Sequence, residues 1–248
     1  MRLGSRARKR SRKRGDGALL LAVPRFQQPD DVTCGPTCLA QVYRFYRHDK
    51  ELAAIIADTP RHADGGTLGA YLGISALRDG FRARLYSYNV RVFDPTWYDL
   101  DRDQLIDKLC RRREAVSSEK IRWAITGYLT FLELGGELKF TELSEKLLAG
   151  ILARRHPIIT GLNATYLWRT PREHKGEDDD IRGDPVGHFG VISGYYPRSG
   201  GFIVRDPSPH VPFNRSGRYV VKAERLIAAI LLGDITYDAI LLELYPKR

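Results

Sequence analysis

Cysteine is scarce in this sequence. Its 248 residues include three cysteines, Cys34, Cys38 and Cys110. A low and odd number of cysteines argues against a disulfide framework and favours reduced thiols. A chain of this length also buries most of its surface on folding, so it needs no cross-links for stability. We therefore expect free thiols, at least one of which is available for chemistry.

Long hydrophobic runs are missing as well. No uninterrupted apolar stretch reaches the roughly 18 residues that a membrane-spanning helix requires. The apolar residues 18–23 follow a basic segment, but they fall short of the roughly 7–15 residues of a signal-peptide core. We therefore expect a chain without a membrane span, located in the cytoplasm.

Acidic residues are absent from positions 1–14, and this explains most of the basic balance of the chain. The formal net charge is +10, and residues 1–14 (MRLGSRARKRSRKR) contain eight Lys or Arg. The remainder is close to neutral, which argues against a specific nucleic-acid surface on the folded part. Because dense like charges repel one another and stay solvated, we expect residues 1–17 to be a disordered tail. The tail either only aids solubility or binds an anionic partner such as RNA, a lipid surface or an acidic protein.

Hydrophobic periodicity predicts a helical first half. After a short strand at 18–25, a helix is expected from Gly35, with apolar residues on one face from Leu39 onward at i, i+3, i+4 and i+7. Gly80 is expected to end a second helix. This second helix is predicted at 65–80. The further predicted elements are helices at 101–114, 118–134 and 141–154, and a strand at 81–92.

The second half of the sequence is predicted to be rich in strands. The turn residues Pro-Arg-Ser-Gly at 197–200 join two β-rich runs and predict a hairpin. The charged stretch 165–184 is expected to be an exposed loop and a candidate lid over the site. The predicted elements are strands at 157–162, 188–195, 201–206, 218–221 and 237–244, and a helix near 223–232.

These elements predict an α+β fold in a single domain spanning residues 18–248. A helical half, about 18–155, would pack on an antiparallel β half, about 156–248, with the active site in the cleft between them. Such a cleft would bring residues near position 34 close to residues near position 188.

Cys34 has the setting of a reactive thiol. It lies directly before a helix start in Gln28-Pro-Asp-Asp-Val-Thr-Cys34-Gly-Pro, and Pro36 suits the first helical turn. Unpaired backbone N–H groups and the positive end of the helix dipole favour the thiolate, which is the reactive form. Gly35 leaves room for a substrate carbonyl, and Gln28 is able to donate a hydrogen bond to an oxyanion beside the N–H of Cys34. Cys34 is therefore the candidate nucleophile.

His188 and Asp206 are the candidate partners of this thiol. His188 opens the apolar run Gly-His-Phe-Gly-Val-Ile-Ser-Gly-Tyr, where its backbone is fixed and its ring is accessible. It is able to accept the thiol proton and later return it to a leaving amine. Asp206 follows the run Phe-Ile-Val-Arg, and pairing across the 197–200 turn would place it diagonally near His188. There it would hold the imidazole tautomer and stabilise the imidazolium.

Together these motifs resemble the C39-like cysteine peptidases, a branch of the papain-like fold. That family has a Gln six residues before a Cys-Gly helix start, a later Gly-His-hydrophobic strand that runs into Gly-Tyr, and a following Asp-Pro. Gln28, Cys34, His188 and Asp206 match these positions in order and spacing. The resemblance spans roughly residues 20–245 and implies a stand-alone member without a transporter. It implies a Cys-His-Asp triad with a Gln oxyanion hole, acting on peptide or protein substrates without a cofactor or metal.

Other interpretations stay open at this point. The same thioester chemistry would serve a transpeptidase, a deamidase or an acyltransferase, and the fold would also serve a non-catalytic peptide-binding module. Cys38 is expected to pack in the core, and a zinc site with Cys34 lacks a second pair of ligands. The remaining histidines are expected to be structural or on the surface: His48, His62, His156, His174 and His210.

Overall fold

The computed structural model describes residues 17–63, 65–233 and 238–247. Except for Gly17, the predicted basic tail therefore lies outside the described residues. An eight-stranded, mostly antiparallel sheet has the order β3-β2-β10-β4-β7-β8-β9, with β1 paired to β7. Its strands are β1 (Leu19–Leu20), β2 (Phe81–Ser87), β3 (Glu137–Lys139), β4 (Ile158–Asn163), β7 (Gly187–Tyr196), β8 (Gly201–Arg205), β9 (Arg218–Lys222) and β10 (Ile240–Pro246). The short strands β5 (Glu173–His174) and β6 (Glu177–Asp178) form a separate hairpin.

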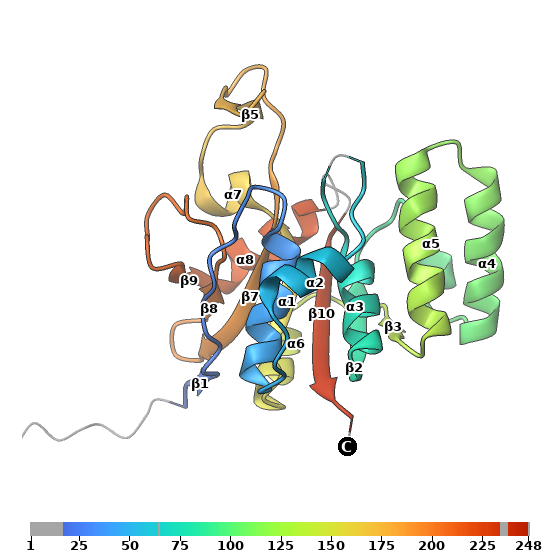
Figure 1. Ribbon diagram of the computed structural model, residues 1–248, viewed down its shortest axis with the longest axis horizontal. Helices are drawn as coiled ribbons and strands as arrows, with labels where there is room; N and C mark the ends of the chain where they lie inside the picture. Colours follow the sequence, from blue (N-terminus) through green and yellow to red (C-terminus); the bar gives the residue numbers. More distant parts are fainter. Residues whose placement is uncertain (1–16, 64, 234–237, 248) are drawn as a thin grey trace, which may run out of the picture.

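Helices cover both faces of this sheet (Figure 1). The α-helices are α1 (Cys34–Phe45), α2 (Leu52–Asp58), α3 (Gly69–Arg78), α4 (Arg102–Ala115), α5 (Glu119–Glu133), α6 (Glu145–Ala153), α7 (Ala164–Trp168) and α8 (Ala223–Leu231). α1 and α3 pack on β7, β10 and β2, whereas α6 and α8 contact β4 and β7 from the opposite face. No described helix has the length and hydrophobicity that crossing a bilayer demands.

The last strand lies in the middle of the sheet. β10 pairs antiparallel with β2 on one side and with β4 on the other. Its first five residues are all buried, as is typical of a strand in a sheet that is covered on both faces. The expected division into a helical half and a β half does not describe this arrangement, because β2 and β3 from the first half extend the same sheet. The hydrophobic run at 240–244 predicts a buried strand, but it does not specify which strands flank it.

Capping side chains define the helices of the central part of the chain. Asp101 and Gln104 form a capping box at α4, and Ser118 and Ser144 each accept the backbone N–H three residues later. Such caps satisfy N–H groups that have no partner within the helix. The predicted helices at 101–114, 118–134 and 141–154 are confirmed with small differences at their ends.

α5 packs on α3, and α4 packs on the outer side of α5 (Figure 1). α2 and β3 were not predicted.

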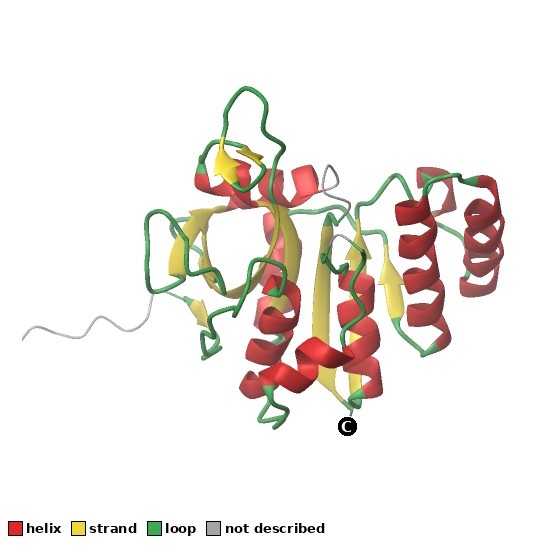
Figure 2. Cartoon of the chain, turned by 45° about the horizontal axis from the view of Figure 1, so that its top comes forward, coloured by secondary structure: helices red, strands yellow, loops and turns green. Residues whose placement is uncertain are grey.

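The strands around the site form the predicted hairpin. β7 pairs with β8 across the 197–200 turn, in a register that places Val191 opposite Arg205. On its other edge β7 pairs with β4, and Leu162 lies opposite His188. A bulge interrupts β7 between Ile192 and Gly194. Bulges increase local twist, and Figure 2 shows these strands curving away from the flatter region around β10.

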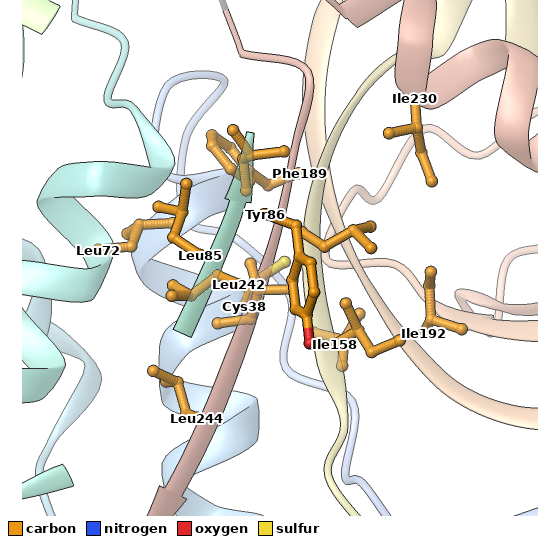
Figure 3. Packing of buried hydrophobic residues seen from close by; sticks show 14 of the residues in the cluster. Cys38, Leu72, Leu85, Tyr86, Ile158, Phe189, Ile192, Ile230, Leu242 and Leu244 are labelled. Atoms are coloured by element: carbon orange, nitrogen blue, oxygen red, sulfur yellow. The ribbon is translucent and has the colours of Figure 1, made fainter. Parts of the chain in front are cut away.

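The core lies between the helices and the sheet and contains the side chain of Cys38. Figure 3 shows this thiol among apolar side chains that include Leu72, Leu85 and Leu242. Cys38 is fully buried, as are Leu39, Val42 and Tyr43 on the predicted face of α1. The predicted packing role of Cys38 is therefore confirmed. This face anchors α1 on the sheet and thereby fixes the helix start, where Cys34 lies.

Candidate active site

Cys34 is the first residue of α1 and is half-buried. Thr33 precedes it as the N-cap but makes no side-chain cap hydrogen bond, so the first backbone N–H groups of the helix are left for other partners. Gly35 allows a close approach here, because a Cβ at this position would lie 2.7 Å from Cγ2 of Thr67. The helix start therefore presents the thiol beside backbone donors in a tightly packed surrounding.

His188 and Asp206 are hydrogen-bonded to each other. The Nε2 atom of His188 lies 2.8 Å from Oδ1 of Asp206, and the two side chains are 7% and 1% exposed. The register that pairs Val191 with Arg205 puts Asp206 level with Gly190, two residues along the strand from His188. Residues two apart share one face of a strand, which is why the side chains meet.

The charges of this pair stabilise each other. Burial disfavours the imidazolium, but the Asp206 carboxylate and the neighbouring Cys34 thiol outweigh it and raise the pKa of His188 to about 10. Burial likewise disfavours the Asp206 carboxylate, yet His188, Tyr219 and the N–H of Ser208 hold its pKa below the usual value. His188 and Asp206 therefore form an ion pair at neutral pH. Because Nε2 is bound to Asp206, Nδ1 is the ring nitrogen left for the thiol.

Two aromatic residues that the sequence analysis missed complete this network. The Tyr219 hydroxyl donates to Oδ2 of Asp206 over 2.6 Å, and the Nε1–H of Trp168 donates to the Tyr219 oxygen over 3.2 Å. The Trp168 ring also lies 5.2 Å from the His188 ring, centre to centre. The sequence offered one hint, a tryptophan within an otherwise charged stretch. That stretch is not an irregular loop, because it contains α7 and the β5–β6 hairpin.

A cavity of about 240 Å³ opens beside the thiol and the imidazole. Cys34 and His188 both line it, whereas Asp206 lies behind His188 and away from the cavity wall. His62 and Asp238 also line it, although the sequence analysis gave His62 no functional role and did not single out Asp238. The lining residues are Asp31, Val32, Cys34, His62, Gly66, Thr67, Leu68, Lys120, Trp123, Gly161, Leu162, Gly187, His188, Phe189 and Asp238.

Gln28 lies near this site but does not line the cavity. Its Nε2 donates to the Asp30 carbonyl over 2.8 Å, and its backbone N–H donates to the Pro207 carbonyl over 3.0 Å. Its Oε1 is buried and has no hydrogen-bond partner among the described residues. Gln28 is thus fixed beside the loop that follows Asp206.

The other two thiols have different surroundings. Burial, followed by the nearby charges of Cys34 and Asp206, raises the pKa of Cys38 well above its usual value. Cys110 is half-buried on α4, away from the cavity. Within the described part of the chain, no three His, Cys, Asp or Glu side chains converge to hold a metal ion.

No family model matches this sequence, and no curated protein matches it at a significant level. Three solved structures are similar to the chain over most of its length. A double-glycine-motif protease from an AMS/PCAT transporter, in complex with the leader peptide, is 16% identical, with 92% of this chain and 94% of that chain covered and a TM-score of 0.45. The peptidase domain of Streptococcus ComA, a bifunctional ABC transporter of a quorum-sensing pathway, is 15% identical, with 91% and 99% covered and a TM-score of 0.45. A candidate C39-like peptidase from Bacillus anthracis is 13% identical, with 93% and 98% covered and a TM-score of 0.46. These values describe a likeness in overall outline.

Proposed function

We propose that this protein is a cysteine peptidase that hydrolyses peptide bonds through Cys34, His188 and Asp206. One observation carries the proposal: Cys34 and His188 line one cavity, and the buried Asp206 binds the far side of the His188 ring. A thiol at a helix start, a base beside it and a carboxylate that orients the base are the parts of a nucleophilic site. The order of these residues along the chain, and the resemblance of their sequence motifs to those of C39-like cysteine peptidases, also support it.

The reaction begins when the Cys34 thiolate attacks the substrate carbonyl carbon. The raised pKa of His188 keeps its imidazole protonated at neutral pH, so that a positive charge lies beside Cys34 when the thiolate attacks. His188 then gives its proton from Nδ1 to the leaving amine, and a thioester with Cys34 remains. Water then attacks the thioester and gives one proton to His188; the C–S bond breaks, the carboxylic acid product leaves, and the Cys34 thiolate is regenerated beside the imidazolium. Asp206 keeps Nε2 protonated, so that the reacting nitrogen always faces Cys34.

The negative oxygen of the tetrahedral intermediate needs donors. The N–H of Cys34 at the helix start is one, and the Gln28 amide is proposed as the second. A primary amide carries two N–H donors, and the Asp30 carbonyl uses one of them. Loss of one such donor typically costs about 3–4 kcal/mol of transition-state stabilisation. We therefore expect Gln28→Ala to lower kcat while leaving Cys34 reactive.

The resemblance of the motifs to C39-like peptidases suggests peptides or small proteins as substrates. In this proposal residues 18–248 form one catalytic domain, and the basic residues 1–17 bind an anionic partner or only aid solubility. The proposed chemistry uses side chains and backbone groups of the chain itself, and the proposed location is the cytoplasm.

The test is a digest of a peptide library, read by mass spectrometry, with the wild type, Cys34→Ala and Cys110→Ala. Cys110→Ala is the matched control, because this thiol lies on α4 outside the cavity. We expect Cys34→Ala to lose at least about a thousandfold in rate, as nucleophile removal does in other enzymes. Equal activity of wild type and Cys34→Ala would refute the proposal. Products that have lost ammonia, or peptides joined together, would instead identify a deamidase or a transpeptidase.

A further inference from the structure

Asp238 lies in the wall of the active-site cavity with one carboxylate oxygen unused. The residue is 6% exposed and lies two positions before β10. Its Oδ2 accepts the backbone N–H of Gly69 at the start of α3, over 2.8 Å. Its Oδ1 is buried and has no hydrogen-bond partner among the described residues. A structural role at the α3 start therefore accounts for one oxygen only.

An unpaired buried carboxylate oxygen is costly, and most buried polar atoms in proteins have a partner. Here burial raises the pKa of Asp238 to about 8, and the Gly69 N–H only partly offsets it. Within the described part of the chain, no basic side chain lies close enough to Asp238 to lower this pKa. Such a group is poised to bind a ligand that donates a hydrogen bond or carries a positive charge.

The backbone around Asp238 is fixed by close packing. A Cβ on Gly161 would lie 2.1 Å from the Asp238 carbonyl oxygen, and a Cβ on Gly69 would lie 2.6 Å from Ile240. These two glycines let the start of β10 approach β4 and α3 directly. The carboxyl group is therefore held rigidly in the cavity wall, as a specificity residue requires.

The cavity suits one side chain. Its volume of about 240 Å³ is below the roughly 300–1,000 Å³ of sites for drug-sized ligands. Trp123 forms part of its wall, with the ring centre 4.2 Å from that of Tyr71 and 5.2 Å from that of His62, and adds apolar surface to the lining. The ionisable groups of the lining are the carboxyl groups of Asp31 and Asp238, the Cys34 thiol, the Lys120 ammonium and the imidazoles of His62 and His188. Among them, Asp238 has a buried oxygen without a hydrogen-bond partner in the described part of the chain, and a positively charged side chain would match it.

We propose that Asp238 is the specificity-determining residue of this cavity and binds the ammonium or guanidinium group of a lysine or arginine next to the scissile bond. The inference rests on the proposed peptidase function. Binding of a cation beside Oδ1 favours the charged carboxylate and supplies the missing partner. The preference for a basic substrate should therefore strengthen as the pH rises and Asp238 loses its proton.

The test compares peptide pairs that differ only in lysine against norleucine, and in arginine against citrulline. The readout is the ratio of kcat/KM within each pair, for the wild type and for Asp238→Asn. The asparagine retains an oxygen for the Gly69 N–H but cannot carry a charge. We expect the wild type to prefer the basic peptide by about ten- to a hundredfold, the range typical of hydrogen bonds to charged groups, and Asp238→Asn to lose most of this ratio.

The pH dependence of this ratio is a second readout. Other ionisable groups line the cavity, and their effects on the chemical step cancel when two peptides are compared at the same pH: Asp31, Cys34, His62, Lys120 and His188. Their effect on the charge of the peptide is the same in Asp238→Asn, which keeps all of them. The wild-type ratio should therefore rise more steeply than that of Asp238→Asn between about pH 6 and pH 9, through the pKa of Asp238. A wild-type ratio near one at every pH would overturn the inference.

Failure of this inference can be separated from failure of the proposed function. Cys34-dependent cleavage without a preference for basic peptides would leave the peptidase standing and refute the role of Asp238. If no peptide is cleaved, calorimetric binding of the lysine and norleucine peptides to Cys34→Ala still tests the cavity. Tighter binding of the lysine peptide, lost in Cys34→Ala/Asp238→Asn, supports the inference, and equal binding overturns it.

Discussion

Replacing Tyr219 by phenylalanine removes one oxygen atom from the centre of the site and should weaken both folding and catalysis. The Tyr219 hydroxyl donates to Oδ2 of Asp206 over 2.6 Å and accepts from the Trp168 indole. Burial, reinforced by Asp206, raises the pKa of Tyr219 well above its usual value, so the hydroxyl stays a neutral donor at every working pH. The phenyl ring preserves the packing, and the change isolates the hydrogen bond.

The size of the effect follows from the burial of Asp206. A hydrogen bond to a charged group contributes about 1.5–3 kcal/mol, and Asp206 is fully buried, so water cannot replace the lost donor. We expect Tyr219→Phe to lower the free energy of unfolding by this amount at neutral pH. Because Asp206 orients His188, we also expect kcat to fall about tenfold, with a smaller change in KM.

The stability loss in Tyr219→Phe should depend on pH through the titration of Asp206. The pKa of Asp206 is lower in the folded state than the unfolded value of about 4, so the carboxylate stabilises the protein above that pH. This stability is lost as the pH falls through the folded-state pKa. The difference between wild type and Tyr219→Phe should therefore be full at neutral pH and shrink in acid, and the pKa of Asp206 should rise in the variant.

The assays are urea unfolding at several pH values and NMR titration of the Asp206 carboxyl carbon. Tyr46→Phe is the matched control, because the Tyr46 hydroxyl donates to a neutral acceptor, the Leu244 carbonyl, over 2.8 Å. The control should lose about 1 kcal/mol without altering the Asp206 titration. The reasoning fails if Tyr219→Phe leaves the Asp206 titration unchanged, or if its stability loss does not exceed that of the control.

Two further predictions concern the buried groups Glu243 and His188. In Glu243→Gln we expect a loss of about 3–5 kcal/mol in urea unfolding at neutral pH, because this fully buried carboxylate accepts from Arg154 and His156. The loss should shrink as the pH falls, since the pKa of Glu243 lies below its usual value, and a pH-independent loss would contradict this account. In the wild type, kcat/KM should stay constant into the alkaline range and decline only near pH 10, the pKa of His188. A decline near the unperturbed histidine pKa of about 6.5 would show that Asp206 does not raise the pKa of His188 in solution.

Sequence alone determined the parts of the site that depend on near neighbours. The helix start at Cys34 follows from Gly35 and Pro36, and the turn at 197–200 specifies the hairpin whose register sets Asp206 beside the His188 strand. Serine and aspartate caps define the helices between residues 101 and 154. These signals act over a few residues, so they can be recognised in the sequence without knowledge of the fold.

Only the tertiary structure decided which distant residues meet. Asp238 lies 169 residues from Gly69, and Trp168 lies 51 residues from Tyr219, yet each pair is joined by a hydrogen bond. The central position of β10, and the presence of β2 and β3 in the same sheet, also could not be predicted from the sequence. Strand order depends on which buried faces and edges fit together across the whole domain, and no local pattern encodes that choice. The meeting of Cys34 and His188 at one cavity was therefore predictable from motifs, whereas the groups that surround them and shape the cavity were not.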